Sequence, residues 1–218
     1  MSMIVTIDGP AGAGKSSAAR ALAARLGFDF IDTGAMYRAV TLAGLQAKCD
    51  CADPAAVARL LDGMKLDMPS GKVILNGNDV TAAIRTPEVT ASSGVVASNA
   101  QVRSRLVDWQ RRIAHGRAFV CEGRDQGTVV FPDALCKFFL FADPVERARR
   151  RHRELGGGPT LDEVLHAQEE RDARDAARHI APMAPAEDAI LLDSTRLTLD
   201  EVVARMEQTV RQRMQDAQ

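Results

Sequence analysis

The residues that most constrain the fold lie near the start of the chain, where an apolar run leads into Gly-Pro-Ala-Gly-Ala-Gly-Lys-Ser at positions 9–16. The spacing Gly-x-x-x-x-Gly-Lys-Ser, between a strand and a helix, is typical of a phosphate-binding loop. We expect Gly9, Gly12 and Gly14 to adopt positive φ, which brings backbone N–H groups close to phosphate oxygens. The next helix, from Ser16 to about Leu26, should direct its unpaired N–H groups at the same anion.

Two side chains of this loop add a chemical prediction. Lys15 is expected to act as a mobile cation for the β- and γ-phosphates of ATP, and the Ser16 hydroxyl to ligate the accompanying magnesium ion. The alternative is an ordinary glycine-rich turn, which the spacing and the flanking strand and helix disfavour. The predicted ATP-binding residues are Gly9, Pro10, Ala11, Gly12, Ala13, Gly14, Lys15, Ser16 and Ser17.

Composition limits the class of protein. The chain has 218 residues, 46% hydrophobic and 26% charged, which fits one sizeable α/β core with inserted segments. Its 28 basic and 29 acidic residues give a charge of −1, which favours neither nucleic acid nor a membrane surface as a partner. The first residues show no basic region followed by an apolar core, and no apolar run approaches a length of about 18 residues, so we expect a cytoplasmic protein. The cysteines lack zinc-site spacing and should be reduced thiols.

Short apolar runs alternate with longer helical patterns, which is typical of parallel βα units. Strands buried between two layers of helices read as continuous apolar runs. The sequence therefore predicts an α/β fold with a parallel sheet. The expected core strands are residues 3–7, 28–31, 119–121, 137–141 and 189–192.

Two segments depart from this alternation. Residues 72–80 predict a β-hairpin around Asn76-Gly77, within a small insert. Glycines at 156–158 precede an arginine-rich helix predicted over 160–178, and prolines follow it, which we interpret as a movable lid. Capping boxes at Thr160 and Thr198, each with a glutamate three residues later, predict where two helices begin.

Charged and polar residues follow the second and third predicted strands. Ligands of open parallel sheets bind at the carboxyl ends of the strands, so we expect Asp32, Thr33 and Arg38 to face the phosphate loop, together with the run that begins Glu122-Gly123-Arg124-Asp125. The alternatives are a surface salt bridge between Arg124 and Asp125, and a solvated helix position for Arg38.

A third group of charges lies on the predicted lid helix. Arg171, Arg174, Asp175 and Arg178 have the spacing of one helical face, which could clamp phosphates. The alternative is a solvated face, which we expect for most of the arginines between 147 and 153 on the preceding helix. Nucleic-acid binding is disfavoured because stacking aromatic residues are absent nearby.

These motifs, in this order, resemble those of bacterial cytidylate kinases. The resemblance spans nearly the whole chain, and its most specific part is Gly-Arg-Asp-Gln-Gly-Thr-Val-Val-Phe-Pro-Asp at 123–133. The other matching segments are the phosphate loop and residues 32–38, 84–89, 102–103, 170–175 and 193–195.

The resemblance implies a P-loop nucleoside monophosphate kinase fold, with a five-stranded parallel sheet flanked by helices. One kinase domain, residues 1–218, would comprise a core (1–33, 100–155 and 186–218), a monophosphate-binding region with its insert (34–99) and a helical lid (156–185). It also implies the reaction of ATP with CMP or dCMP, with Mg²⁺ as cofactor, and we expect a monomer. The alternative is a P-loop kinase of UMP, AMP or a small non-nucleotide acceptor.

Site roles follow from the resemblance by position. Arg38 and Arg124 would hold the acceptor phosphate, and Arg103 and Asp125 would read cytosine. Gly94 stands where the family often has a serine, so no serine contact to the base is predicted. The implied CMP-binding set is Thr33, Arg38, Arg103, Arg124, Asp125, Arg171 and Asp175. The predicted catalytic residues are Lys15, Arg124, Arg171 and Arg178, and the metal site is Ser16, with Asp32 and Glu122 acting through water.

Overall fold

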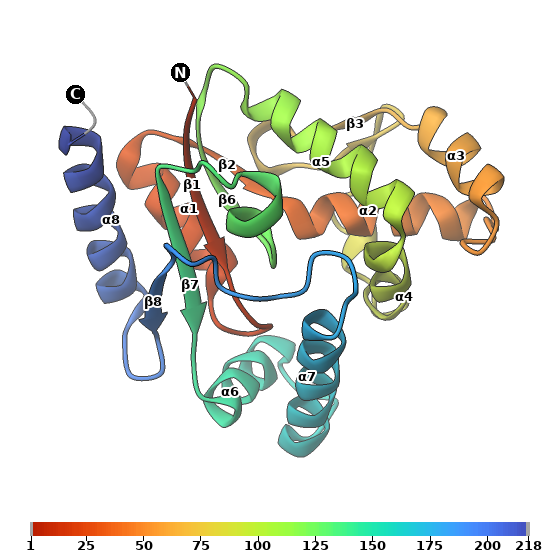
Figure 1. Ribbon diagram of the computed structural model, residues 1–218. Coiled ribbons are helices and arrows are strands. Elements are labelled where there is room, and N and C mark those ends of the chain that lie inside the picture. The colour runs from red at the N-terminus through yellow and green to blue at the C-terminus, as the bar shows by residue number, and fades with distance from the viewer. Residues whose placement is uncertain (1, 217–218) are drawn as a thin grey trace. The chain divides into compact units, whose positions relative to one another are not determined.

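A computed structural model describes residues 2–216 and shows a five-stranded sheet with helices packed against it (Figure 1). β1 lies at its centre and pairs in parallel with β6 and β7, and β8 pairs in parallel with β7. The predicted fold class is confirmed, and each predicted strand is present with its ends shifted by at most one residue. In spatial order the strands are β2 Asp29–Asp32, β6 Ala118–Glu122, β1 Met3–Asp8, β7 Cys136–Phe141 and β8 Ile190–Asp193.

The hydrophobic core lies between this sheet and two helices, α1 (Lys15–Leu26) and α8 (Leu199–Asp216), which pack on each other. Leu22 of α1, Met206 of α8 and Phe138 of β7 are almost completely buried in it. Each such side chain contributes about 1.5–3 kcal/mol by leaving water. This core holds the start of α1 against the end of β1, where the phosphate loop lies.

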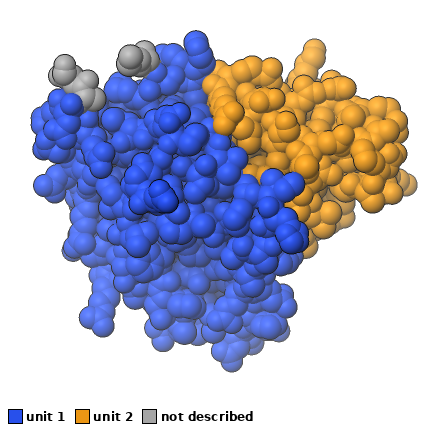
Figure 2. Space-filling view, in the orientation of Figure 1, with its two compact units in different colours: residues 1–30, 114–218 blue, residues 31–113 orange. Residues whose placement is uncertain are grey.

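The chain divides into two compact units, residues 1–30 with 114–218 (unit 1) and residues 31–113 (unit 2), which Figure 2 shows in blue and orange. Unit 1 also contains a π-helical turn, Gln126–Val130, and two helices that pack against each other, α6 (Pro144–Leu155) and α7 (Leu161–Ala176).

The two predicted capping boxes are both present in unit 1. The Glu163 N–H donates to Thr160 Oγ1 and the Thr160 N–H donates to the Glu163 carboxylate, and α8 begins in the same way after Thr198. Helix α7 ends at Ala176, two residues before the predicted end. The chain turns back there, and the Met183 N–H donates to the Asp175 carbonyl.

Unit 2 is largely helical and carries a small antiparallel sheet. The predicted hairpin is confirmed, with Asn76 and Gly77 at φ of 50° and 85°, as a type I′ turn requires. A third strand was not predicted, because two residues are too short for a periodic pattern. The helices are α2 Thr33–Gln46, α3 Pro54–Asp62, α4 Pro87–Ser98 and α5 Ala100–Ala114, and the strands are β3 Leu66–Asp67, β4 Ile74–Leu75 and β5 Asn78–Asp79. Short 3₁₀ turns occupy Pro69–Gly71 and Ala83–Arg85.

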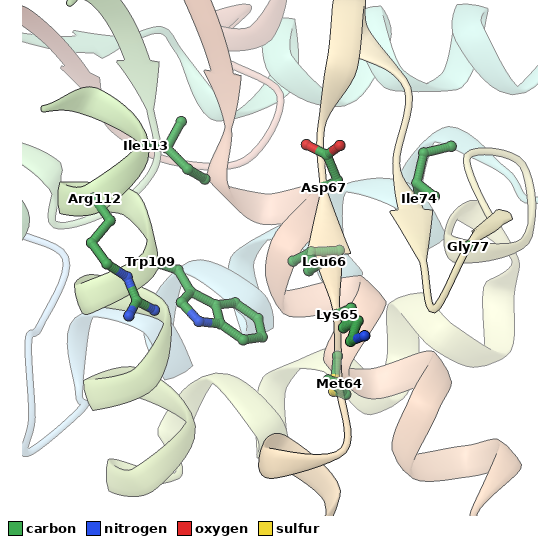
Figure 3. A pocket seen from close by; sticks show the side chains of 9 residues that line it. All are labelled: Met64, Lys65, Leu66, Asp67, Ile74, Gly77, Trp109, Arg112 and Ile113. Carbon is green, nitrogen blue, oxygen red and sulfur yellow. The ribbon is translucent and has the colours of Figure 1, made fainter. Parts of the chain in front are cut away.

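A groove of about 330 Å³ lies between this small sheet and α5 (Figure 3). Trp109 and Ile113 of α5 line one side, and Leu66 and Ile74 of the sheet line the other. None of the predicted site residues lines this groove, so it is separate from the candidate site. Within residues 2–216, no helix combines the length and the apolar character needed to span a membrane.

Candidate active site

The phosphate loop joins β1 to α1 in unit 1 and has the predicted backbone. Gly9, Gly12 and Gly14 have φ of 140°, 75° and 91°, a region that side chains disfavour. Gly9 is also constrained by space, because a Cβ atom there would lie 2.0 Å from the Leu140 carbonyl oxygen of β7. Any side chain at position 9 would therefore clash with β7, so this position requires glycine.

Three carbonyl groups of the loop are held by side chains. Lys15 Nζ donates to the Pro10 oxygen at 2.7 Å, Arg147 Nη1 to the Ala11 oxygen at 2.8 Å and Ser194 Oγ to the Ala13 oxygen at 3.2 Å. These bonds fix the shape of the loop from α1, α6 and the end of β8. The roles of Arg147 and Ser194 were not predicted, although Ser194 lies in one of the matching motifs.

Lys15 is buried within unit 1, which differs from the mobile cation expected from the sequence. Burial lowers the pKa of Lys15 from 10.5 to about 7, and the charges of Arg124 and Arg171 act in the same direction, while Glu122 opposes them. Removing a cation from water and placing others near it both disfavour its charged form. The nearby phosphates of a bound nucleotide would have the opposite effect.

Ser16 and Glu122 place a hydroxyl and a carboxylate side by side at the start of α1. Ser16 Oγ donates to Glu122 Oε1 at 2.7 Å, and the Glu122 side chain is buried at the end of β6. Among the described residues, no group of three or more His, Cys, Asp or Glu side chains could hold a metal ion. Hydroxyl and carboxylate oxygens suit Mg²⁺, which in kinases binds few protein ligands together with phosphates and water. The donors therefore fit Mg²⁺ that is bound jointly with ATP.

Asp8 is a buried acid next to the phosphate loop that the sequence analysis missed. Its two carboxylate oxygens accept the N–H groups of Gln126 at 2.9 Å and Gly127 at 2.8 Å. Burial raises the pKa of the Asp8 carboxyl to about 6, although these two hydrogen bonds oppose the shift. Asp8 thus ties the turn after Arg124 and Asp125 to the end of β1.

Asp175 brings together two arginines that the sequence analysis assigned to the site. Its carboxylate accepts Arg124 Nε at 2.9 Å and also pairs with Arg178, which lies beyond the end of α7. The Asp175 side chain is 6% exposed, so the cluster is largely removed from water. The alternative of a surface salt bridge between Arg124 and Asp125 does not fit the structure, because Asp125 is buried and the Arg124 side chain is 16% exposed.

The predicted arginine face of α7 is only partly correct. Arg174 is exposed and donates to the Glu170 carbonyl of its own helix, so it does not share the environment of Asp175. Arg171 is half-buried, and its charge acts on Lys15. The site therefore receives Arg171 and Arg178 from this segment, and Arg174 remains on the surface.

The expected solvated face of α6 is also only partly correct. Arg149, Arg151 and Arg153 are exposed as expected, but Arg147 is buried and Arg150 is half-buried. Arg150 Nη2 donates to the Ser194 carbonyl at 2.6 Å. The two exceptions have different partners: Arg147 donates to the Ala11 carbonyl of the phosphate loop, whereas Arg150 contacts the residues that follow β8.

Unit 2 holds the other predicted site residues. Asp32 Oδ1 accepts the Ala35 N–H at 2.8 Å and so caps α2, which begins with the buried Thr33. Asp32 Oδ2 lies 3.5 Å from Arg38 Nη2 and 3.6 Å from Arg85 Nη2. Arg38 is 19% exposed, so the alternative of a solvated helix residue is wrong.

Arg103 lies on α5 and is buried within unit 2. Its guanidinium carbon is 5.8 Å from the centre of the Tyr37 ring, and its Nη1 donates to the Ala97 carbonyl at 3.4 Å. Gly94 lies in α4, where the nearby Ser93 hydroxyl donates to the Thr90 carbonyl. The two predicted cytosine-reading residues, Arg103 and Asp125, belong to different units, and their contacts with the base stay a prediction.

Comparison with known proteins identifies relatives along nearly the whole chain. A family model described as cytidylate kinase matches residues 5–212. A cytidylate kinase from Rhodopirellula baltica is 46% identical over 216 residues, covering 98% of this chain and 94% of the relative. One from a Geobacter species is 45% identical over 219 residues, covering 97% and 94%.

A comparison of structures supports the fold. A crystal structure of an uncharacterized protein from Eubacterium ventriosum matches with a TM-score of 0.55 and 12% sequence identity, covering 97% of this chain and 99% of that one. At this identity the similarity concerns the fold alone.

Proposed function

The chain belongs to the cytidylate kinase family, and from this premise we propose that it transfers the γ-phosphoryl group of ATP to CMP or dCMP, giving ADP and CDP or dCDP. The observation that carries the proposal for this chain is the arrangement within unit 1. There Lys15 of the phosphate loop lies within electrostatic reach of Arg124 and Arg171, and Ser16 contacts Glu122. Such a set of groups can hold a triphosphate and neutralise the charge that is transferred.

The proposed reaction needs no strong general base. The attacking atom is an oxygen of the CMP phosphate, which is largely ionised at neutral pH. Catalysis then depends on placing donor and acceptor in line and on stabilising the negative charge of the γ-phosphoryl group. We assign the stabilising role to Lys15, Arg124, Arg171 and Arg178.

Magnesium would be held mainly by the nucleotide. When bound, Mg²⁺ neutralises charge on the β- and γ-phosphates. Of this chain's residues, Ser16 would ligate it directly, while Glu122 and Asp32 would hold its water molecules. The hydrogen bond from Ser16 to Glu122 supports the first part of this assignment.

We propose that Arg38 and Arg124 hold the CMP phosphate, that Arg103 and Asp125 contact cytosine, and that Thr33 adds a hydroxyl. Arg171 and Asp175 would contact the sugar and phosphates. Cytosine presents an amino donor where uracil presents a carbonyl, so a carboxylate at Asp125 would distinguish the two bases.

We propose that residues 156–185 form a lid which closes over the two nucleotides, that residues 34–99 form the monophosphate-binding region, and that residues 1–33, 100–155 and 186–218 form the core. Positive φ at Gly156, Gly157 and Gly158 supports a hinge before α7. Closure would exclude water, which competes with CMP for the phosphoryl group. We further propose that the protein acts as a cytoplasmic monomer on free nucleotides, without nucleic acid or a membrane.

One assay tests the proposed reaction. ADP formation is followed with Mg-ATP and, in turn, CMP, dCMP, UMP, AMP, GMP and shikimate. We expect rapid turnover with CMP and dCMP, and slow ATP hydrolysis without an acceptor. Preferred turnover of UMP, AMP or shikimate would contradict the proposed acceptor.

A further inference from the structure

Both backbone polar groups of Ala11, in the middle of the phosphate loop, are held by charged side chains from two helices. The Ala11 N–H donates to Asp172 Oδ1 of α7 at 2.9 Å. The Ala11 carbonyl accepts from Arg147 Nη1 of α6 at 2.8 Å, and the same Nη1 forms an ion pair with Asp172 Oδ2. We call Arg147, Asp172 and the Ala11 backbone the Ala11 clamp.

The two charged side chains of the Ala11 clamp are largely removed from water. The Arg147 side chain is 7% exposed and the Asp172 side chain 15% exposed. Arg147 Nε also donates to the Ala142 carbonyl at 3.1 Å, which fixes the plane of the guanidinium group. A buried charge without its partner is costly, so loss of either side chain would change the environment of the other.

The contact between α7 and the loop extends beyond the hydrogen bonds. A Cβ atom on Gly12 would lie 2.6 Å from Nε2 of Gln168, one turn before Asp172 on α7, and 3.1 Å from the Arg147 carbonyl of α6. The α6 and α7 pair is therefore packed directly on the first half of the phosphate loop. A shift of α7 would have to move the Ala11 N–H or break its bond.

One turn of α7 contacts both the phosphate loop and the arginines assigned to the phosphates. Asp172 holds the loop for ATP, and Asp175, three residues later, pairs with Arg124 and Arg178, which are assigned to the transferred and acceptor phosphates. Because Asp172 and Asp175 lie on the same helical turn, a change in the shape of the loop should also change the position of the two arginines.

We propose that Asp172 and Arg147 are positioning residues that set the shape of the phosphate loop and couple it to α7. This inference rests on the proposed function, which assigns ATP to this loop. Coupling is reciprocal, so a nucleotide that orders the loop should order α7, and loosening α7 should weaken nucleotide binding. Neither residue is placed in contact with the reacting atoms.

The substitution Asp172→Asn tests the charge of the clamp at constant size. Asparagine retains one oxygen that can accept the Ala11 N–H, but its amide group cannot pair with the Arg147 guanidinium. Glu169→Gln is the matched control, because Glu169 is an exposed acid on the same helix. Arg147→Lys is a second test, since a single ammonium group cannot reproduce the planar guanidinium contacts.

Two measurements, both made without CMP or dCMP, test the coupling. Titration with Mg-ADP should show weakening by roughly tenfold in Asp172→Asn, a smaller loss in Arg147→Lys and none in Glu169→Gln. Hydrogen exchange should show that Mg-ADP protects Leu161–Ala176 in the wild type and in Glu169→Gln, but not in Asp172→Asn. A purely structural role would destabilise the variant without removing this ligand-dependent protection.

The proposal is overturned if Asp172→Asn binds Mg-ADP like Glu169→Gln and retains the protection of α7. If Asp172→Asn does not fold, Asp172→Glu replaces it: the charge is kept but the longer side chain displaces α7, so weaker Mg-ADP binding is expected and wild-type binding refutes the clamp. A wild type that shows the coupling but phosphorylates neither CMP nor dCMP would overturn the proposed function and leave the clamp standing.

Discussion

Replacing Lys15 with methionine should cut turnover by orders of magnitude and, at the same time, stabilise the ligand-free protein. Methionine has a similar length and can occupy the buried site, but it carries no charge for the phosphates. Turnover should fall by at least about 100-fold, because a charged group that stabilises the transition state contributes about 3 kcal/mol or more. The fold should remain intact.

The gain in stability follows from the burial of Lys15. Its pKa falls from 10.5 to about 7 in the folded chain. At pH 7 this shift costs about 4 kcal/mol relative to an unperturbed lysine. The lost hydrogen bond to the Pro10 carbonyl and the unpaired oxygen offset about 2 kcal/mol of the gain. We therefore expect about 2 kcal/mol of net stabilisation, or a rise in Tm of roughly 4–8 °C for a chain of this size.

The pH dependence gives a sharper test than the stability alone. Because the folded-state pKa of Lys15 is depressed, the unfolded chain binds this proton more tightly between about pH 7 and 10.5. The free energy of unfolding of the wild type should therefore rise with pH through that interval. The extra stability of Lys15→Met over the wild type should shrink toward pH 10. Urea unfolding followed by circular dichroism at pH 7, 8.5 and 10 measures both effects.

The exposed Lys65 provides the control, because Lys65→Met should change stability by less than about 0.5 kcal/mol at every pH. A Lys15→Met protein less stable than the wild type at pH 7, or one whose advantage stays constant to pH 10, would refute the reasoning. Turnover near that of the wild type in the folded variant would refute the role of the loop.

Three further predictions concern the base, the lid and the loop. Asp125→Ala should collapse the ratio of kcat/KM for CMP over UMP by at least ~10-fold, while the exposed Asp133→Ala keeps it; an equal loss for both substrates would mean that Asp125 does not read the base. ATP and CMP together should protect residues 160–178 from hydrogen exchange far more than ATP alone, and equal protection in the free and doubly bound protein would exclude a closing lid. Gly9→Ala should destabilise by about 3 kcal/mol in urea unfolding, because its Cβ would meet the Leu140 carbonyl, whereas Gly63→Ala, at φ −78° with ordinary contacts, should change stability by less than about 1 kcal/mol.

The elements that could be predicted from the sequence depend on local interactions. The strands follow from apolar runs, the starts of α7 and α8 from capping boxes, and the hairpin from Asn76-Gly77. In each case the residues that determine the structure lie within a few positions of one another. The two-residue strand β3 depends instead on its pairing with β4, which no local pattern reveals.

The partners of charged residues could not be predicted in the same way. Arg147 and Arg149 lie two positions apart in an arginine-rich helix, yet one holds the phosphate loop and the other is exposed. Helical spacing shows that they point in different directions, but not which direction is buried. That choice depends on how α6 packs on α7 and on the phosphate loop, contacts that join residues far apart in the chain.

The partners of the acids at the ends of the strands could not be predicted either, although their positions could. Asp8, Asp32 and Glu122 each end a strand, and the sequence places all three at one kind of position. Their partners give them different roles. Asp8 accepts two backbone N–H groups of the turn that begins at Gln126, Asp32 caps α2, and Glu122 accepts a hydrogen bond from the Ser16 hydroxyl. Asp8 lies directly before the phosphate loop, so its position was visible in the sequence. An acid at such a strand end therefore predicts a place in the site, whereas its chemical role follows only from the donors that the fold brings to it.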